Sequence, residues 1–469
     1  MSFNQRQDHH YRSPINNQWR NGDDLEAVVL EGIHRARHEI LVAVQELSLP
    51  SIAIALVEKQ RQGIPVKVVL ENTYSQPWSQ ESLADLEPHQ RRRHQQLEQL
   101  ADHNHDGVLS QAEREQGDAV LILQRGGVPM LDDTADGSAG SGLMHHKFMV
   151  IDRREVITGS ANFTSSCMHG DPDDPQTRGN VNHLLRMESP ELAGLFAHEF
   201  ATLWGDGPGG TNDSRFGLGK HNGGLQSVQI GTTRVSVLFA PQAEDDPANG
   251  LAVISEVLHG ARRHIDLALF VLSAQSLGNA LAERQRQGVN LRVLVDPGFA
   301  NRSFSEVLDL LGVAMPDRHC RLEAGNRPLT QGLDSVGSPR LPAGDKLHHK
   351  IAVMDDHLVI SGSFNWSPSA AHQNDETLLL IDSPSLAAHF RREINRLWQG
   401  AELGVSPRLA RKLERQRARC GSGSQRASSQ GVPAEHIQPP MRTTSAAKSS
   451  SPTTSFTTKS MQEGSPRDT

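Results

Sequence analysis

The chain has 469 residues, of which 36% are hydrophobic and 22% are charged. Its formal net charge is −8, and because residues 408–469 hold eleven basic and four acidic residues, the rest of the chain carries about −15. Such an acidic body argues against a strong nucleic-acid binder, and the three cysteines predict neither a disulfide framework nor a metal site.

The N-terminal residues 1–20 are polar and contain no apolar stretch, so they predict no signal peptide. No apolar run in the chain reaches the length of a membrane span. We therefore expect a cytoplasmic or peripheral membrane protein.

The first predicted elements occur twice. Residues 36–44 (ARHEILVAV) match residues 261–269 (ARRHIDLAL), and each copy is followed by a helical segment that ends in Arg-Gln-Gly and by an apolar strand. Later, two helices that begin with Ser-Pro match each other, at residues 189–204 and 383–398. Strands that alternate with helices predict α/β layers with mainly parallel strand pairing.

The first copy contains 22 extra residues before its histidine motif, and a distinctive loop lies within them. Its pattern is typical of an EF-hand calcium loop, with a glycine, Gly107, at the sixth position. The predicted ligands are Asp102, Asn104, Asp106, the Val108 carbonyl, Ser110 and Glu113. The loop resembles a single EF-hand, which implies a structural or regulatory Ca²⁺. A polar turn that binds no metal would use similar residues.

The most informative motif also occurs twice. It reads His-x-Lys-x-x-x-x-Asp, and a Gly-Ser-x-Asn element starts fourteen residues after its first histidine in both copies. The first copy contains His145, Lys147, Asp152, Ser160 and Asn162, and the second contains His348, Lys350, Asp355, Ser363 and Asn365. Two copies with identical internal spacing predict one site at the meeting point of two pseudo-symmetric halves.

Short apolar runs follow each motif histidine and predict buried strands. Residues two apart on a strand face the same side, so His145 projects with Lys147, and His348 with Lys350. The intervening His146 and His349 then face the opposite side and are expected to pack in the interior. Imidazole, ammonium, hydroxyl and carboxamide groups that converge in this way suit a phosphate group.

These residues resemble the paired HKD motifs of the phospholipase D superfamily, and the similarity extends over residues 22–404. The resemblance implies a metal-independent phosphodiesterase in which one histidine forms a phosphohistidine intermediate and the other acts as the acid and base. It implies that the motif lysines, serines and asparagines bind the phosphate. We expect Asp152 and Asp355 to fix strand geometry rather than to contact substrate.

Glu376 is expected to orient one catalytic imidazole, because family members place a carboxylate or amide at this position. It aligns with Asn182 of the first half. A carboxylate favours a protonated imidazole, so we predict that Glu376 pairs with His348 as the general acid. Asn182 would then position a neutral His145, which we predict to be the nucleophile.

The C-terminal part differs in composition. Residues 408–419 are a candidate basic helix that could contact anionic lipid or nucleic acid, with a solvated face as the simpler interpretation. From residue 421 the chain is rich in Ser, Thr, Pro and Gln, which predicts disorder. The predicted organisation is a first repeat at 22–220, an EF-hand-like insertion at 88–120, a second repeat at 221–404, and a basic segment with a disordered tail at 405–469.

The predicted fold is therefore α/β, with two phospholipase D-like sandwich repeats around mixed, mainly parallel sheets. The predicted function is hydrolysis of phospholipid head-group esters at a membrane surface by a monomer, with the acidic body as the deciding feature. A nuclease with the same chemistry is the alternative, with nucleic acid as its substrate. A non-catalytic, calcium-responsive binding module is the second alternative.

Overall fold

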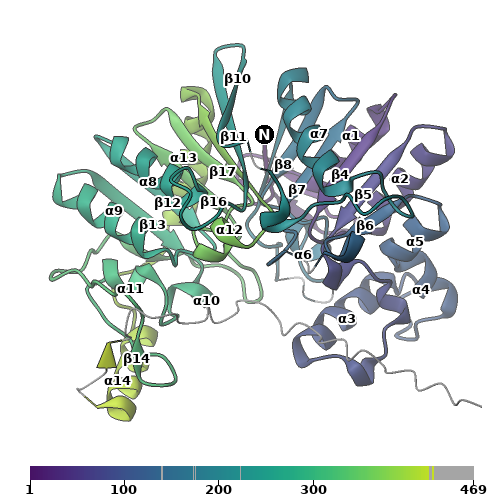
Figure 1. Cartoon of the computed structure of the whole chain (residues 1–469). Coiled ribbons are helices and arrows are strands. Elements are labelled where there is room, and N and C mark those ends of the chain that lie inside the picture. The colour runs from purple at the N-terminus through teal and green to yellow at the C-terminus, as the bar shows by residue number, and fades with distance from the viewer. Residues whose placement is uncertain (139–140, 173, 175, 222, 422–424, 427–469) are drawn as a thin grey trace, which may run out of the picture. The chain divides into compact units, whose positions relative to one another are not determined.

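A computed structural model describes residues 1–138, 141–172, 174, 176–221, 223–421 and 425–426 (Figure 1). In the first half, one sheet contains the strands β1 (Ser2–Phe3), β4 (Ile40–Val44), β5 (Val66–Leu70), β6 (Met130–Asp132), β7 (Lys147–Ile151), β8 (Glu155–Gly159) and β9 (His183–Glu188). Their order across the sheet is β1-β9-β8-β7-β4-β5-β6. The two motif strands, β7 and β8, therefore lie in the middle of the sheet.

The second half repeats this sheet. Its strands are β10 (Gln226–Ile230), β11 (Thr233–Ala240), β12 (His264–Leu269), β13 (Asn290–Val295), β15 (Val336–Ser338), β16 (Lys350–Met354), β17 (Leu358–Gly362), β18 (Glu376–Asp382) and β19 (Glu402–Leu403). Their order is β10-β11-β18-β17-β16-β12-β13-β15-β19. The run from β18 to β15 reproduces the run from β9 to β6, which confirms the predicted pseudo-symmetric duplication.

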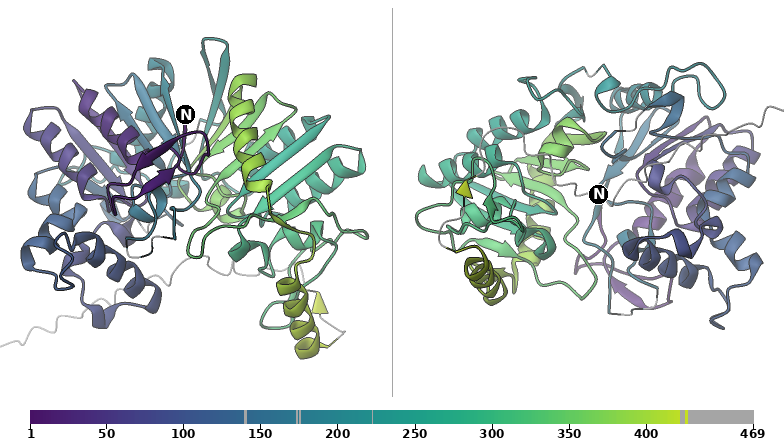
Figure 2. Two further views of the ribbon diagram at one scale, coloured as in Figure 1. Left: turned by 180° about the vertical axis from the view of Figure 1, so that it is seen from behind. Right: turned by 60° about the horizontal axis from the view of Figure 1, so that its bottom comes forward.

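Helices cover both faces of each sheet (Figure 2). The helices that cover the sheets are α1 (Leu25–Arg35), α2 (Pro50–Arg61), α5 (Ala119–Arg125), α7 (Pro190–Trp204), α8 (Gly250–Gly260), α9 (Gln275–Arg286) and α13 (Pro384–Trp398). Phe196 of α7 and Phe390 of α13 belong to one buried apolar cluster that also contains Phe148 of β7 and Ile351 of β16. The inner faces of the two sheets therefore share a core with α7 and α13, while α1, α2 and α5 pack on the first sheet and α8 and α9 on the second.

The remaining elements complete the described chain. They are β2 (His10–Arg12), β3 (Trp19–Asn21), α3 (Pro88–Ala101), α4 (Gln111–Gly117), α6 (Ser165–Met168), α10 (Pro297–Ala300), α11 (Glu306–Leu310), β14 (Arg321–Leu322), α12 (Pro368–His372), α14 (Pro407–Cys420) and β20 (Gln425–Arg426), with five 3₁₀ turns at Asn72–Tyr74, Trp78–Gln80, Leu83–Asp85, Ala135–Gly137 and Gly217–Gly219. None of the helices in the described part of the chain is long and apolar enough to cross a bilayer.

The expected mainly parallel pairing is wrong, although the sheets are mixed as predicted. Only β4–β5, β5–β6, β12–β13 and β13–β15 pair in parallel within the two large sheets; the remaining neighbours are antiparallel. Each motif strand turns back directly into its partner, through Asp152 and Arg153 in β7–β8 and through Asp355 and Asp356 in β16–β17, all with positive φ. The apolar runs in the sequence indicated strands that are buried on both faces, and parallel sheets usually have such strands. Here α7 and α13 bury the inner faces of the sheets, so the same apolar composition occurs in antiparallel strands.

The chain ends also differ from the prediction. Strand β1 pairs with β9, so the first sheet contains residues that precede the predicted boundary at 22. The predicted basic helix is confirmed as α14, but Leu409 and Leu413 are buried against the second half rather than solvated. The predicted disordered tail lies outside the described residues, apart from the short strand β20.

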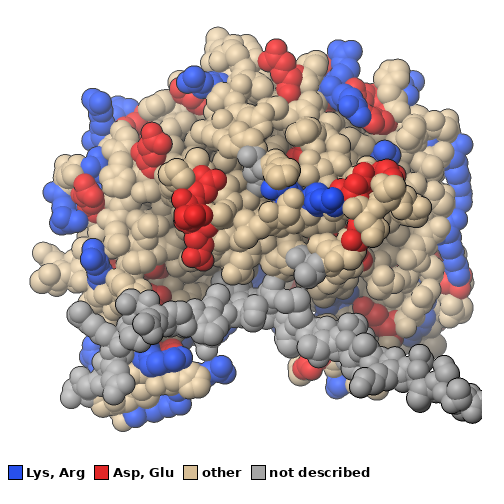
Figure 3. Space-filling model, viewed as in Figure 1, with Lys and Arg blue, Asp and Glu red and all other residues tan. Residues whose placement is uncertain are grey.

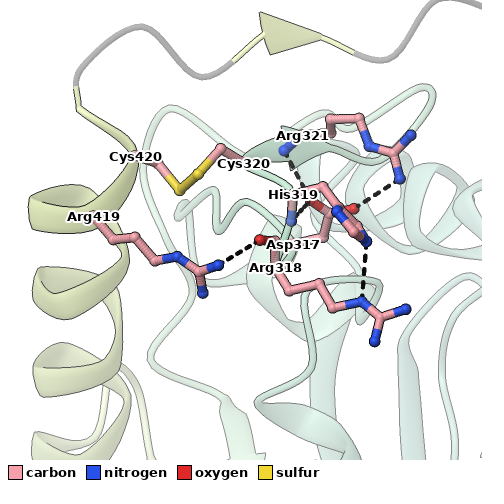
Figure 4. The surroundings of a disulfide bond; sticks show 7 residues. All are labelled: Asp317, Arg318, His319, Cys320, Arg321, Arg419 and Cys420. Carbon is pink, nitrogen blue, oxygen red and sulfur yellow. Dashed lines mark hydrogen bonds and ion pairs between the residues drawn. A yellow bond between two sulfur atoms is a disulfide. The ribbon is translucent and has the colours of Figure 1, made fainter.

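A disulfide joins Cys320 to Cys420 at the end of α14 (Figure 4). This bond contradicts the prediction of no disulfide framework. The two cysteines are separated by 100 residues, and only the docking of α14 beside the loop around β14 brings them together. No local spacing in the sequence carries that information.

Candidate active site

The two motif histidines meet because each strand entrance hydrogen-bonds to the other half. The His145 amide donates to the carbonyl of Asp375 at 2.9 Å, and the His348 amide donates to the carbonyl of Val181 at 3.1 Å. Neighbouring bridges join Met144 to Asp375 and Val181 to Leu347. Both motif histidines therefore lie at the junction of the halves, and both imidazoles are largely buried.

The partners of the imidazoles are crossed between the halves. Nδ1 of His145 lies 2.7 Å from Oε2 of Glu376, and Nδ1 of His348 lies 3.0 Å from Oδ1 of Asn182. The expected pairing of Glu376 with His348 and of Asn182 with His145 is therefore wrong. Each histidine enters beside the β9 or β18 edge of the opposite half, so alignment within one repeat assigns the partner to the wrong imidazole.

The motif serines lie behind these partners. The Ser363 hydroxyl donates to Glu376 at 2.6 Å, and the Ser160 hydroxyl donates to Asn182 Oδ1 at 2.8 Å. The preceding residues must be glycine, because a Cβ at Gly159 would lie 2.2 Å from the His183 carbonyl oxygen, and Gly362 is equally close to the Thr377 carbonyl. The serines thus hold the groups that orient the histidines, and phosphate binding by their hydroxyls stays a prediction.

Both motif lysines are buried at the junction. The Lys147 ammonium donates to the His145 carbonyl at 2.8 Å and to Gln45 at 3.3 Å, and the Lys350 ammonium donates to the His348 carbonyl at 2.8 Å. Lys350 also lies over the Phe270 ring, 5.1 Å from its centroid. Burial lowers the pKa of Lys147 to about 8, and burial together with Lys147 lowers the pKa of Lys350. An anionic ligand between these two buried lysines would favour their protonated, cationic forms.

The motif asparagines show the same symmetry. The Asn162 amide donates to Gln45 at 3.2 Å, so Gln45 joins Asn162 to Lys147. The Oδ1 atoms of Asn162 and Asn365 are buried and have no hydrogen-bond partner among the described residues. Unused polar atoms of this kind are uncommon in protein interiors. Both atoms lie at equivalent positions of the two motifs, which is consistent with a ligand that hydrogen-bonds to both.

Burial controls the protonation of the motif histidines and of Glu376. It lowers the pKa of His145 and of His348 well below the usual range, and the neighbouring ammonium groups of Lys147 and Lys350 lower both further. Burial raises the pKa of Glu376 to about 7, although Lys147 and the hydrogen bond from Ser363 oppose it. The site without substrate therefore favours neutral imidazoles, which have a free nitrogen lone pair.

The motif aspartates lie in the turns and not at the junction. Asp152 accepts the amides of residues 37–39, and Asp355 accepts those of residues 262–264, at 2.6–3.1 Å. Partial burial would raise the pKa of each carboxyl, but these amides outweigh it and lower the pKa. Both side chains therefore fix the strand turns, as predicted.

The neighbouring histidines face away from the lysines, as the strand alternation predicted. His146 lies 3.0 Å from Glu199 and 2.9 Å from the Thr377 hydroxyl, and His349 lies 3.2 Å from Glu393. The two glutamates occupy matching positions in the duplicated Ser-Pro helices. The duplication in the sequence could therefore have identified them as partners of His146 and His349.

The sequence analysis did not identify one buried cation, Lys220. Ligand atoms of His146, Glu199 and Asp375 lie within 4.8 Å of one another, an arrangement that suits a metal ion. The Lys220 ammonium lies 2.7 Å from Asp375 Oδ1 and also contacts Glu199, so it supplies the positive charge there. Lys220 lies in the connection between the halves and belongs to no motif.

The predicted calcium loop lies between α3 and α4. The Gly107 amide donates to Asp102 Oδ2 at 3.0 Å, and Asn104 and Asp106 each accept the amide two residues further on. The Glu113 carboxylate accepts from the Ser110 amide and hydroxyl at the start of α4. The other predicted ligand is the Val108 carbonyl, in an exposed part of the loop.

Comparisons with known proteins agree with this arrangement. A family model described as "Cardiolipin synthase, PLD-like domain" matches residues 29–204 and 254–398. The mitochondrial cardiolipin hydrolase of Xenopus laevis is 28% identical over 142 residues, which cover 30% of this chain and 58% of that protein. The human mitochondrial cardiolipin hydrolase is 26% identical over 151 residues, covering 32% and 52%. This chain therefore spans about half the length of these curated relatives.

A phospholipase D of Rickettsia prowazekii (strain Madrid E) is 26% identical over 180 residues, which cover 38% of this chain and 75% of that protein. Among solved structures, the phosphatidylserine synthase of Haemophilus influenzae Rd KW20 has a TM-score of 0.53 and 15% identity, covering 89% of this chain and 95% of that one. That likeness shows the fold. Because the family model covers both halves, and each half contributes its motif histidine and lysine to the junction, the chain belongs to the phospholipase D superfamily as a two-repeat member.

Proposed function

We propose that the junction is the active site of a phospholipase D-type phosphodiesterase. The observation that carries the proposal is the crossed pair of imidazoles, each fixed through Nδ1 beside a buried lysine. An imidazole that donates from Nδ1 has its lone pair on Nε2. Two such nitrogens and two ammonium groups supply a nucleophile, an acid and base, and charge stabilisation for a phosphate.

We assign the nucleophile to His145, for a reason that differs from the one the sequence offered. Attack on phosphorus converts its ring into an N-phosphorylated imidazolium, and the adjacent Glu376 carboxylate stabilises that positive charge. His348 is paired with the neutral Asn182, which orients the ring without a permanent negative charge. The negative charge of the bound phosphodiester favours protonation of His348, which makes it the acid.

The proposed reaction has two balanced displacements. Nε2 of His145 forms a bond to phosphorus while the bond to the leaving oxygen breaks, and that oxygen takes a proton from Nε2 of His348. Water then attacks phosphorus, gives its proton to His348 and displaces His145. Lys147 and Lys350 offset the charge on the phosphoryl oxygens in both steps.

Trapping the covalent intermediate tests this assignment. After a rapid quench in alkaline denaturant, which preserves the P–N bond of a phosphohistidine, we expect labelled phosphate on wild-type protein and none on His145→Ala. The matched His348→Ala variant keeps the nucleophile, and with a substrate whose leaving group needs no proton it should accumulate the phosphoenzyme. Phosphoenzyme in His145→Ala at wild-type yield would reverse the two roles.

For the substrate, we propose a phospholipid head-group ester, with phosphatidic acid as the product. The acidic body of the chain supports a lipid over nucleic acid. Purified protein should be offered phosphatidylcholine, cardiolipin, and single- and double-stranded nucleic acid, each with and without calcium. Cleavage of nucleic acid at protein concentrations that leave vesicles intact would establish the nuclease alternative.

We also propose that the loop from Asp102 to Glu113 binds one Ca²⁺. The fit rests on the donor set and on Oδ1 of Asp102, which is buried and has no hydrogen-bond partner among the described residues. The ligands would be Asp102, Asn104, Asp106, the Val108 carbonyl, Ser110 and Glu113. Glu113 would have to leave its present contact with the Ser110 amide.

A contact path supports a regulatory role for this loop. Arg93 of α3 pairs with Glu46 at 2.7 Å, and the Glu46 carbonyl accepts the amide of Phe163, directly after Asn162. Glu46 follows Gln45, which contacts Lys147. A change in α3 can thus reach two phosphate-binding candidates through a single ion pair.

Calorimetry tests the calcium proposal. Wild-type protein should bind one Ca²⁺, Glu113→Gln should bind it at least tenfold more weakly, and the matched Glu115→Gln variant outside the loop should behave as wild type. Chelation should lower phosphodiesterase activity only in part, because none of the predicted metal ligands belongs to the paired motifs. Uptake unchanged by Glu113→Gln would refute the site.

A further inference from the structure

A strongly basic cavity of about 580 Å³ lies between α10 and α14. Its lining contains five cationic side chains and no carboxylate, and they are Arg302, Arg408, Lys412, Arg415 and Arg419. The space-filling view shows Lys and Arg gathered over α14, at the lower left (Figure 3). This surface is opposite in sign to the acidic body of the chain.

The described part of the chain does not neutralise the charges of the cavity. Among the described residues, none of the five cations has a salt bridge to a carboxylate. Lys412 donates to the Asn301 carbonyl at 2.6 Å, and Arg419 donates to the Arg318 carbonyl at 2.7 Å. Burial, with Arg302 and Arg408 nearby, lowers the pKa of Lys412, which reflects the repulsion within the cluster. An anion would relieve that repulsion.

The fold fixes this cluster in place. Arg408, Lys412, Arg415 and Arg419 recur at helical spacing and share one face of α14. Leu409 and Leu413 anchor the helix in the core of the second half, and the disulfide to Cys320 secures its last turn (Figure 4). Arg411 and Arg417 lie on the same helix but do not line the cavity.

The cavity is one short helix away from a catalytic histidine. Phe299 of α10 contacts Phe270 with ring centroids 4.6 Å apart, and Phe270 contacts His348 with centroids 4.8 Å apart. Asp296, which begins α10, accepts the amide of Leu347 at 2.9 Å, directly before His348. A ligand held in the cavity would therefore lie beside the second half of the active site.

We propose that this cavity binds the phosphate of an anionic phospholipid and so holds the protein at an anionic lipid surface with His348 nearby. The proposal deepens the proposed lipid phosphodiesterase and rests on it for the choice of lipid. Planar guanidinium groups match phosphate oxygens in geometry and charge. The lining contains no aromatic side chain on which a nucleic-acid base would stack.

Vesicle sedimentation tests the proposal with full-length, oxidised protein. The His145→Ala background removes turnover, so binding can be measured even if the proposed activity fails. With vesicles of phosphatidylcholine and phosphatidic acid, we expect R408Q/R415Q to bind roughly tenfold more weakly than the background protein. The matched R411Q/R417Q variant removes the same charge from α14 outside the cavity and should keep nearly full binding. With vesicles of pure phosphatidylcholine, both double variants should bind to the same extent as the background protein.

Three results would overturn the proposal. Equal weakening in both double variants would mean that the helix acts only through its total charge. Displacement of the vesicles by inorganic phosphate at the same phosphate concentration would identify a free-phosphate site instead of a lipid site. Binding of single-stranded DNA that R408Q/R415Q abolishes, with vesicle binding unaffected, would assign the cavity to nucleic acid.

Discussion

The contact between Glu376 and His145 distinguishes the two motif histidines, because among the described residues Nδ1 of His145 contacts a carboxylate whereas Nδ1 of His348 contacts the amide of Asn182. We predict that Glu376→Gln lowers kcat by about 10²–10⁴-fold with little change in KM, since the amide keeps the shape but lacks the charge. Steady-state kinetics measure this effect. Asp382→Asn, at the exposed end of the same strand, is the matched control and should retain wild-type kinetics.

The pKa values of Glu376 and Lys147 predict how the activity depends on pH. Glu376 acts as the carboxylate, and its pKa of about 7 means that activity rises as the pH rises through 7. Lys147 acts as the ammonium, and its pKa of about 8 means that activity falls as the pH rises through 8. The profile of kcat/KM should be a narrow bell, and because burial also lowers the pKa of Lys350, replacing both lysines by arginine should move its alkaline side upward. A plateau that extends to pH 10 in wild-type protein would contradict this origin.

The sequence predicted the residues of the site better than their contacts. Matched spacing identified both histidines and both lysines, and strand alternation separated His146 and His349 from them. Spacing within one repeat contains no information about exchange between repeats, so Glu376 was assigned to the wrong imidazole. Lys220 was missed because a single lysine in a connecting segment resembles any solvated lysine until the fold buries it.

At the scale of elements, the alternation of strands and helices predicted the duplicated α/β organisation and the basic helix α14. It did not predict the antiparallel pairing, because a strand buried on both faces has the same apolar composition in either direction. It also missed the docking of α14, which depends on only two apolar residues, Leu409 and Leu413. Two buried leucines can hold a helix in place when a disulfide between cysteines far apart in the sequence supports the same contact.

That bond leads to a prediction for α14. Reduction of Cys320–Cys420 should release the helix locally while the two sheets stay folded, because only its two leucines join the core. Limited trypsin digestion should therefore cut within α14 in reduced protein and spare it in oxidised protein. The Cys320→Ser variant should be cut with or without reductant, whereas Cys167→Ser, at the free buried cysteine, should follow wild type. Equal protection of oxidised and reduced α14 would show that the leucines suffice.

At the scale of the whole molecule, a buried charge network joins the two halves. Lys220 lies between Glu199 of the first half and Asp375 of the second, whose carbonyl accepts the His145 amide. Burial would raise the pKa of Glu199, but Lys220 and His146 outweigh it and lower the pKa to about 2. The same contacts that stabilise the junction thus support the backbone of the active site.

Because of this network, the stability of the junction depends on pH and falls in acid. The folded pKa of Glu199 lies below the ordinary value of about 4.3, so its contribution is fully present above that pH and is lost as the pH falls toward 2. We predict that Glu199→Gln lowers the free energy of unfolding by roughly 3 kcal/mol at pH 7. Urea denaturation at pH 7, 5 and 3.5 should show the gap between the variant and wild type shrinking only below about pH 4.5. Glu191→Gln, an exposed carboxyl on the same helix, is the control, and a gap that stays constant down to pH 3.5 would refute the role of the ionised carboxylate.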